Sequence, residues 1–301
     1  MPSQNDPSKP ALTILTLFDT FTAERRYLQN VSPKTLEWYQ CSWKAFRHHL
    51  IPAKDEAELR IAVRQAVMAM AESGSLKPTS INDYGRCINA FCRWLHTEGH
   101  ISTPIHLAKL KTPEKIPTMM TAAEVERFIR YVPKNRIERR IHAISLVVLD
   151  TGLRITEVLN LRKQDVDLDN LLMKVEKGKG DRQRVVPFTL ALRRLIFRYI
   201  KTECPANSDF IFATRNGSAQ TYRNALRQLK AIGSKLKITD LRFHSMRHLF
   251  ATHYLRSGGS VALLRRILGH ASLETVLIYE HLLTGDLSEA HNGHSILARH
   301  G

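Results

Sequence analysis

The clearest structural pattern in this 301-residue chain is the stretch VVLDTGLRITEVLNLRKQDVD, residues 147–167. Its first residues continue a mostly apolar run that begins at Ile141, which is typical of a buried helix. Gly152 follows Thr151, and a glycine directly after an apolar helical run favours the end of a helix. The stretch therefore predicts one helix that ends at Thr151-Gly152 and a second that begins at Arg154.

The residues around this stretch predict a mainly helical domain with a small β-hairpin. Two β-like runs, Leu171–Val175 and Arg184–Phe188, flank a Gly-Lys-Gly-Asp turn at 178–181. Upstream, Thr121-Ala-Ala-Glu124 has the capping-box pattern of a helix start, and more helices are expected from residue 189 onward. We assign residues 119–301 to this second domain.

The front of the chain predicts a separate, fully helical domain over residues 11–100, after a short polar lead at 1–10. Ser32-Pro33 has the N-cap and first-turn residues of a helix start. Helical spacing covers four segments: 11–29, from 33 onward, 55–72 and 79–97. Residues 101–118 contain Pro104, Pro113 and Pro117 among lysines, which predicts a linker. This linker either follows DNA phosphates or is a solvated tether.

The charge of the chain favours nucleic acid as its partner. It carries 45 Lys and Arg against 28 Asp and Glu, a net charge of +17, and such an excess favours polyanions by neutralising phosphates. Residues 1–110 hold 13 basic and 10 acidic side chains, and residues 111–301 hold 32 and 18. Most of the positive field therefore belongs to the second domain. A basic surface that serves only solubility is the alternative.

The remaining composition indicates a cytoplasmic protein without metal or membrane segments. The four cysteines form no C-x-x-C pair and no zinc-like spacing, which favours reduced thiols. No run approaches the ~20 apolar residues of a membrane span. The histidines of the tail are His281, His291, His294 and His300. No carboxylate or thiol completes a sensible metal-ligand set with them.

Four separated motifs need a common explanation: Thr-Gly-Leu-Arg154, the hairpin with Lys179, His244-Ser-Met-Arg247-His248, and Leu-Gly-His270 followed nine residues later by Tyr279. Each motif alone has an ordinary structural interpretation, such as a surface ion pair or a partly buried tyrosine. Their order and residue types together point to one active site.

These motifs resemble those of the tyrosine recombinase, or phage integrase, family. The quoted stretch 147–167 is similar to the first arginine box of that family, KGKGDRQRVVPF (177–188) to its lysine hairpin, FHSMRHLFATHYLRSGGS (243–260) to its His-x-x-Arg box, and ILGHASLETVLIYEHL (267–282) to its His and Tyr box. The front half, in SPKTLEWYQCSWKAF (32–46) and INDYGRCINAFCRWLHTEGHI (81–101), resembles the SAM-like core-binding domain. The resemblance implies a two-domain, C-shaped clamp around duplex DNA, mainly α with a small β-hairpin or sheet in its C-terminal catalytic domain.

Carried over residue by residue, the resemblance makes Tyr279 the nucleophile, supported by Arg154, Lys179, His244, Arg247 and His270. Two guanidiniums suit the non-bridging oxygens of a phosphodiester. His244 and Arg247 lie three residues apart, on one helix face, and His244 is the candidate base for a tyrosine with a pKa of about 10. Lys179 is assigned as general acid by resemblance, with Lys177 and Arg182 nearby.

Three other tyrosines compare with Tyr279 as nucleophiles. Tyr254 lies seven residues after Arg247 on the same expected helix and is the alternative to Tyr279, whereas Tyr199 and Tyr222 lie among core-like residues.

The resemblance also implies the reaction and the assembly. Tyr279 would form a 3′-phosphotyrosyl bond, and four protomers on a short inverted-repeat DNA site would exchange strands through a Holliday junction, without metal or cofactor. The chain is similar to compact, Xer-like or transposon-resolvase-like members, and we expect no arm-binding domain ahead of the first helix. The tail from Leu282 to about Ala298 either docks on a neighbouring protomer or is a frayed end.

The sequence leaves further partners and two alternative functions open. A sister recombinase or accessory protein is a further possible partner, and a bacterial nucleoid-associated location is expected. A type IB topoisomerase and a DNA-binding module without chemistry are the alternative functions. The DNA sequence recognised depends on base contacts that the amino-acid sequence does not define.

Overall fold

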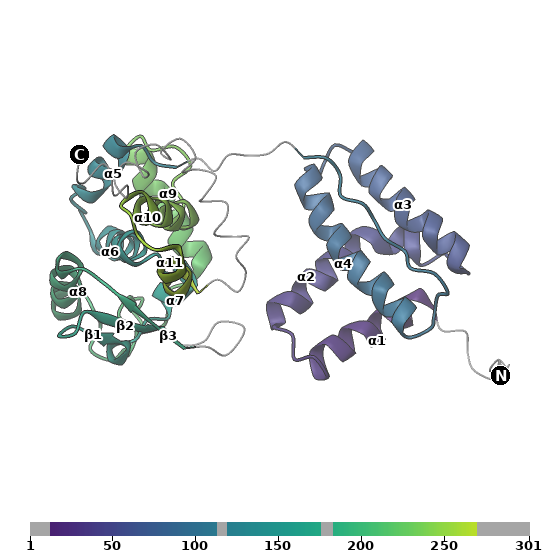
Figure 1. Cartoon of the computed structure of the whole chain (residues 1–301), viewed down its shortest axis with the longest axis horizontal. Coiled ribbons are helices and arrows are strands. Elements are labelled where there is room, and N and C mark those ends of the chain that lie inside the picture. Colours follow the sequence, from purple (N-terminus) through teal and green to yellow (C-terminus); the bar gives the residue numbers. More distant parts are fainter. Residues whose placement is uncertain (1–12, 113–118, 176–182, 270–301) are drawn as a thin grey trace, which may run out of the picture. The chain divides into compact units, whose positions relative to one another are not determined.

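A computed structural model describes residues 13–112, 119–175 and 183–269, which form parts of two compact units, Met1–Lys115 and Ile116–Gly301. Within these residues the fold is mainly helical, with eleven α-helices and one three-stranded sheet, as the sequence predicts (Figure 1). The first unit holds α1 (Ile14–Tyr27), α2 (Pro33–Leu50), α3 (Glu56–Glu72) and α4 (Pro78–Thr97). All four of its expected helices are confirmed.

The first unit is held together by an aromatic core between α1, α2 and α4. Phe18 stacks on Trp43 with ring centroids 4.2 Å apart, and Phe91 meets Phe18 edge-on at 5.2 Å. Such pairs add to the free energy of burying the rings themselves. The expected start of α2 is confirmed, because the Ser32 hydroxyl accepts a hydrogen bond from the backbone N–H of Thr35 and Pro33 is the first helical residue.

Residues 101–112, which the sequence assigns to a linker, lie along the first unit. Ile101 and Ile105 are buried in its core. Glu56 accepts hydrogen bonds from the backbone N–H groups and hydroxyls of Ser102 and Thr103, and these bonds lower the pKa of Glu56 to about 2. Buried apolar side chains and a bound turn keep this segment with the four helices, and we call residues 101–112 the strap.

The second unit is built around α6 (Arg136–Thr151), which packs against four other helices. These are α7 (Ile155–Leu159), α8 (Leu190–Thr202), α9 (Tyr222–Lys235) and α10 (Phe243–Arg256). Short helices α5 (Ala122–Ile129) and α11 (Val261–Leu268) complete the described part, and the capping box expected at Thr121 and Glu124 is confirmed at the start of α5.

The small sheet contains β1 (Val166–Asp167), β2 (Leu172–Val175) and β3 (Arg184–Pro187), antiparallel and in that order. Met173 lies opposite Val186, and both side chains are buried, which fixes the register of the expected hairpin. At the end next to the connecting residues 176–183, Val175 pairs with Arg184. β3 contacts α11, so this strand lies beside the last described helix.

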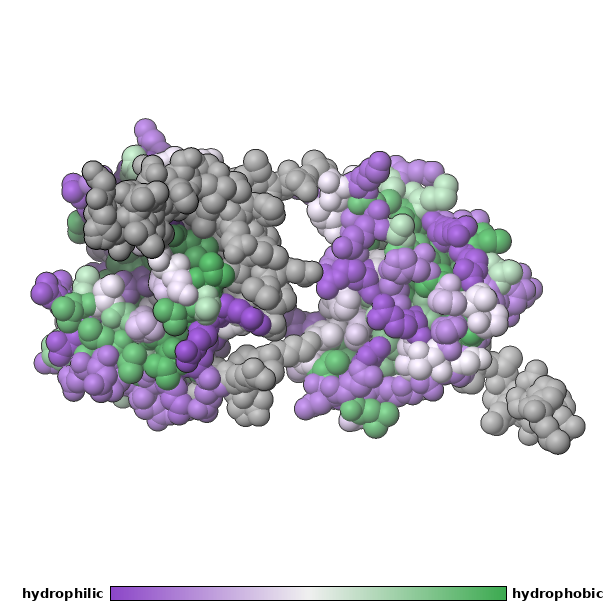
Figure 2. All heavy atoms as spheres, viewed as in Figure 1, coloured by the Kyte–Doolittle hydropathy of each residue, from purple (hydrophilic) through white to green (hydrophobic). Residues whose placement is uncertain are grey.

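The surfaces of both units carry many hydrophilic side chains, with apolar groups on the second unit around the sheet and α8 (Figure 2). Large exposed hydrophobic residues in these elements are Leu172, Val185, Leu190 and Phe197. Across the ranges that the structure describes, no helix is both long and apolar enough to cross a membrane.

Candidate active site

The turn between α6 and α7 depends on a glycine. Gly152 ends α6 with φ +65°, a left-handed conformation that side chains with a Cβ rarely adopt. The hydroxyl of Thr151 accepts a hydrogen bond from the backbone N–H of Leu153 at 3.3 Å. The turn therefore places Arg154 at the N-cap of α7, where the sequence expects it.

Gly152 also lies against α10 and α11 with no room for a side chain. A Cβ at this position would come within 2.3 Å of the Phe250 ring and 2.9 Å of Leu268. We expect Gly152→Ala to lower the free energy of unfolding by more than the roughly 1–2 kcal/mol of left-handed strain, because the clash adds to it.

Gly258 provides a matched control for this substitution in urea unfolding. It has φ +81° and nothing within 4 Å of a built Cβ, so Gly258→Ala introduces backbone strain alone. Equal losses of stability in the two variants would show that the close packing around Gly152 contributes nothing.

Arg154 is half-exposed and shares a carboxylate with a second arginine. Glu157, three residues later on α7, accepts hydrogen bonds from the backbone N–H of Arg154 at 2.8 Å and from its Nη1 at 3.2 Å. Arg184 at the start of β3 binds the same carboxylate through Nη1 at 2.9 Å and Nη2 at 2.7 Å. Burial raises the pKa of Glu157, but the bonds and charges of the two arginines outweigh it and lower the pKa overall.

Arg247 is buried on α10, with 4% of its surface exposed, and its guanidinium links two other elements. Nη1 donates to the carbonyl of Gly152 at 2.5 Å, and Nη2 donates to the carbonyl of Leu268 at 2.8 Å. Arg247 therefore joins the α6–α7 turn to the end of α11.

Three successive carbonyls at the end of α11 are each bound by a different arginine. Arg184 Nε donates to the carbonyl of Ile267 at 2.8 Å, and Arg247 donates to that of Leu268. Arg154 Nη2 donates to the carbonyl of Gly269 at 3.1 Å. The C-terminus of a helix carries partial negative charge, so it brings these cations together just before His270.

His244 lies beside both arginines of the candidate phosphate clamp. It is in the first turn of α10, and its pKa is lowered by partial burial and by the charges of Arg247 and Arg154. A neutral imidazole can accept a proton, as a base must. His248, one turn later, lies edge-on to His244 with ring centroids 4.1 Å apart.

The pair of histidines predicts a pH-dependent stability. Burial, followed by His244 and Arg247, lowers the pKa of His248 to about 4 from an ordinary 6.5. The unfolded chain takes up this proton below pH 6.5 and the folded chain does not, so stability present above pH 6.5 is lost as the pH falls towards 4. We expect that loss, at most about 3 kcal/mol, to shrink in His248→Gln, as measured by urea unfolding at pH 7, 6, 5 and 4. Parallel curves for the two proteins would contradict it.

The structure brings together Arg154, His244 and Arg247, although Arg154 and Arg247 are 93 residues apart in the sequence. The other expected site residues, Lys179, His270 and Tyr279, lie outside the described residues, as do Lys177 and Arg182. Their roles therefore stay predictions.

Sequence reasoning missed Glu157 and Arg184 as parts of this site. A signal for Glu157 was present in its spacing of three residues from Arg154, which suits a helix start. In the sequence Arg184 is an ordinary strand residue, and only the structure shows that the start of β3 meets Glu157 on α7.

The alternative tyrosines have packing roles in the structure. Tyr254 contacts Phe250 with ring centroids 6.0 Å apart, within the small apolar cluster of α10 and α11. Tyr199 is buried as expected, and burial raises its pKa. The core-like interpretation of Tyr222 is wrong: it is 46% exposed, because it is the first residue of α9.

Comparisons with known proteins place the chain among DNA recombinases. The model of the phage integrase family matches residues 118–285. Tyrosine recombinase XerA of Pyrococcus furiosus is 31% identical over 71% of this chain and 74% of its own length. Tyrosine recombinase XerC of Staphylococcus aureus is 28% identical over 92% of this chain and 95% of its own length.

Solved structures share the fold. The Tn1549 transposon integrase in complex with transposon right end DNA has a TM-score of 0.76 at 19% identity, covering 93% of this chain and 98% of that one. A crystal structure of XerA recombinase has a TM-score of 0.53 at 26% identity, covering 92% of this chain and 96% of the other.

Proposed function

Because this chain belongs to the phage integrase family and is a tyrosine-type site-specific recombinase, we propose that it cuts and rejoins DNA through Tyr279. The observation that carries this proposal is the pair Arg154 and Arg247, whose guanidiniums donate to the adjacent carbonyls of Gly269 and Leu268. Two cations that meet neighbouring oxygens can hold the two non-bridging oxygens of one phosphodiester. A scissile phosphate takes the place of these carbonyls when DNA binds.

The clamp stabilises the charge that develops in the reaction. Tyr279 Oη attacks phosphorus and the bond to the deoxyribose 5′-oxygen breaks, which gives a 3′-phosphotyrosyl bond and a free 5′-hydroxyl. His244 accepts the proton of Tyr279, and Lys179 donates a proton to the leaving oxygen. Arg154 and Arg247 offset the extra negative charge on the pentavalent phosphorus.

The reaction is reversible without an energy source. The phosphotyrosyl bond conserves the energy of the phosphodiester, and a 5′-hydroxyl from a partner strand attacks it to rejoin DNA. Neither a nucleotide cofactor nor a metal ion has a step in this scheme. His270 donates a hydrogen bond to the same phosphate.

Strand exchange requires an assembly. In our proposal the two units clamp a duplex, four protomers gather on two short inverted-repeat core sites, and the strands pass through a Holliday junction. The tail from Leu282 to about Ala298 docks on a neighbouring protomer. A sister recombinase or accessory protein completes the assembly where one is needed. In our proposal this recombinase works on DNA of the bacterial nucleoid, in the cytoplasm.

A plasmid carrying two copies of the DNA site tests this proposal. The site is first recovered by sequencing DNA bound to the protein in its native host. Recombination gives products of new connectivity. Relaxation of a supercoiled plasmid without such products supports a type IB topoisomerase, and binding without cleavage supports a DNA-binding module.

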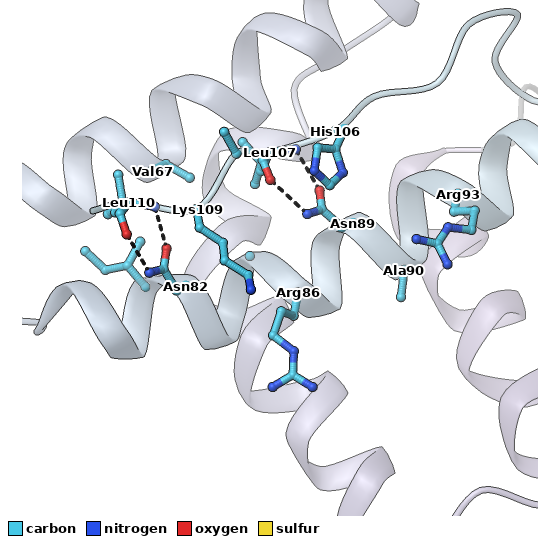
Figure 3. A pocket seen from close by; sticks show the side chains of 13 residues that line it. Val67, Asn82, Arg86, Asn89, Ala90, Arg93, His106, Leu107, Lys109 and Leu110 are labelled. Atoms are coloured by element: carbon cyan, nitrogen blue, oxygen red, sulfur yellow. Dashed lines mark hydrogen bonds between the residues drawn. The ribbon is translucent and has the colours of Figure 1, made fainter. Parts of the chain in front are cut away.

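The first unit offers a basic groove for the DNA backbone. A cavity of about 310 Å³ lies between α4 and the strap, lined among others by Arg86, Arg93 and Lys109 (Figure 3). The amide of Asn89 exchanges two hydrogen bonds with the backbone of Leu107, at 3.0 and 2.8 Å, which fixes the strap beside the helix. Asn82 does the same with Leu110, at 3.0 and 2.7 Å.

Removing the charges of this groove is expected to weaken DNA binding. We expect the triple variant Arg86→Gln, Arg93→Gln, Lys109→Gln to bind less tightly and to show a shallower dependence of log K on log salt. Each lost phosphate contact reduces the slope by about 0.9. Fluorescence anisotropy with labelled duplex, from 50 to 300 mM salt, measures both quantities.

A charge-matched control separates the groove from net charge. Arg194, Arg198 and Lys201 are exposed on α8, and replacing all three by Gln removes the same charge. An equal loss of slope in both triple variants would mean that the groove has no particular part in binding.

A further inference from the structure

Arg184 uses all three guanidinium nitrogens inside the protein. It is the first residue of β3, and only 15% of its side chain is exposed. Nη1 and Nη2 bind the two oxygens of Glu157, and Nε binds the carbonyl of Ile267. A planar fork that meets a carboxylate with two bonds is the strongest arrangement that an arginine makes with an acid.

Glu157 therefore serves two arginines of different exposure. Its own side chain is 9% exposed, Arg184 is 15% exposed and Arg154 is 43% exposed. Arg184 holds both oxygens at 2.7 and 2.9 Å, whereas the Arg154 side chain reaches one of them at 3.2 Å and also reaches Gly269. Arg184, the less exposed arginine, thus makes the stronger of the two ion pairs with Glu157.

We propose that Arg184 is a positioning residue for DNA cleavage. By occupying both oxygens of Glu157, Arg184 keeps the guanidinium of Arg154 turned towards the scissile phosphate. The inference rests on the proposed function, in which Arg154 binds that phosphate. Arg184 itself touches no DNA in this scheme and acts through Glu157 and the end of α11.

The physical reason is competition for a buried charge. Without Arg184, Glu157 is a largely buried carboxylate that still pairs with Arg154. A buried charge that loses a partner is strongly unfavourable. Arg154 then closes onto Glu157 with two bonds and leaves the phosphate. The carbonyl of Ile267 also loses its donor, next to the carbonyls that meet Arg247 and Arg154.

The lack of a side chain at Gly269 allows the end of α11 to lie close to Arg184. A Cβ on Gly269 would come within 3.0 Å of the guanidinium carbon of Arg184, and the residue has φ +64°. The end of α11 therefore approaches the Arg184 guanidinium more closely than a residue with a side chain allows. This close approach joins the start of β3, α7 and α11 in one network.

A double-mutant cycle between Arg184→Met and Arg154→Lys tests the proposal in the full chain. The measurement is the single-turnover rate of covalent adduct formation at saturating duplex containing the recovered site. We expect Arg184→Met to slow it by about 10- to 100-fold, as outer partners of reactive groups do. In the Arg154→Lys background we expect Arg184→Met to slow the reaction less than twofold further. Both substitutions remove the same contact, that of the Arg154 guanidinium with the scissile phosphate, so their effects do not add.

Two further measurements separate positioning from folding. The dissociation constant for DNA is expected to stay within about threefold, since Arg184 contacts no phosphate. Arg193→Met, which removes an exposed arginine paired with Asp169 on the same unit, serves as the control for the loss of a surface ion pair. If Arg184→Met does not fold, Arg184→Lys keeps the cation, and the same cycle is measured with it.

The outcomes are distinct. The positioning role would be overturned if the rate losses of the two single variants multiply in the double variant, or if Arg184→Met reacts at the wild-type rate. In both cases adduct formation by the wild-type protein would still support the proposed recombinase function. Failure of the wild-type protein to form any adduct would instead overturn the proposed function.

Discussion

Tyr279→Phe is expected to abolish the covalent protein–DNA adduct and to leave the affinity for DNA unchanged. The substitution removes only the oxygen that attacks phosphorus in our proposal, and it leaves both arginines of the proposed phosphate clamp, Arg154 and Arg247, in place. A duplex with a nick a few nucleotides to the 3′ side of the scissile phosphate traps the adduct, because the short fragment with the new 5′-hydroxyl diffuses away after cleavage. A denaturing gel then measures the amount of adduct. We expect the loss to exceed about a thousandfold, as for removal of other catalytic nucleophiles.

Tyr254→Phe is the matched control. Tyr254 packs its ring against Phe250, and a phenylalanine keeps that packing. We expect adduct formation at the wild-type level in this variant. Adducts that persist in Tyr279→Phe and disappear in Tyr254→Phe would move the nucleophile to α10.

The sequence predicted the helices well because their ends are local. Ser32 with Pro33, Thr121 with Glu124, and Gly152 after Thr151 are start and stop signals that act within a few residues. The path of the strap was not predictable in the same way. Its prolines indicate an irregular backbone, but its position depends on Asn82 and Asn89, which bind it from α4.

The candidate site was predictable only where residue type determines chemistry. Arg154, His244 and Arg247 stand out because phosphate chemistry uses such groups, and the structure places them together. Glu157 and Arg184 act through a contact between α7 and β3, 27 residues apart in sequence. No local pattern reports which strand residue meets which helix residue, so this pair required the fold.

The two clamp arginines differ in burial, and this difference separates their structural roles. Arg154 has 43% of its side chain exposed, in a pair with Glu157 and a bond to Gly269. Arg247 is 4% exposed and bridges two carbonyls from different elements. A half-exposed ion pair contributes little to stability, whereas leaving a buried carbonyl without its donor costs about 1–3 kcal/mol.

We therefore expect Arg154→Lys and Arg247→Lys to slow adduct formation alike but to differ in stability. A lysine keeps the charge and loses the fork, so each variant is expected to cleave about 100- to 1,000-fold more slowly at saturating DNA. Arg154→Lys should lose less than about 1 kcal/mol of unfolding free energy. Arg247→Lys should lose about 1–3 kcal/mol, because one ammonium cannot reach both the Gly152 and Leu268 carbonyls in the geometry of the fork.

Urea unfolding and single-turnover cleavage on the same preparations decide between these roles. If both variants lose stability equally, the exposed arginine is as structural as the buried one, and the carbonyl bridge is not what distinguishes Arg247. If Arg154→Lys cleaves at the wild-type rate, the phosphate does not depend on its fork, and the clamp reduces to Arg247 with His244. Slow cleavage in both variants with a stability loss confined to Arg247→Lys is the result that we expect, because in our proposal both arginines bind the phosphate, whereas Arg247 also joins the end of α6 to the end of α11 from a buried position.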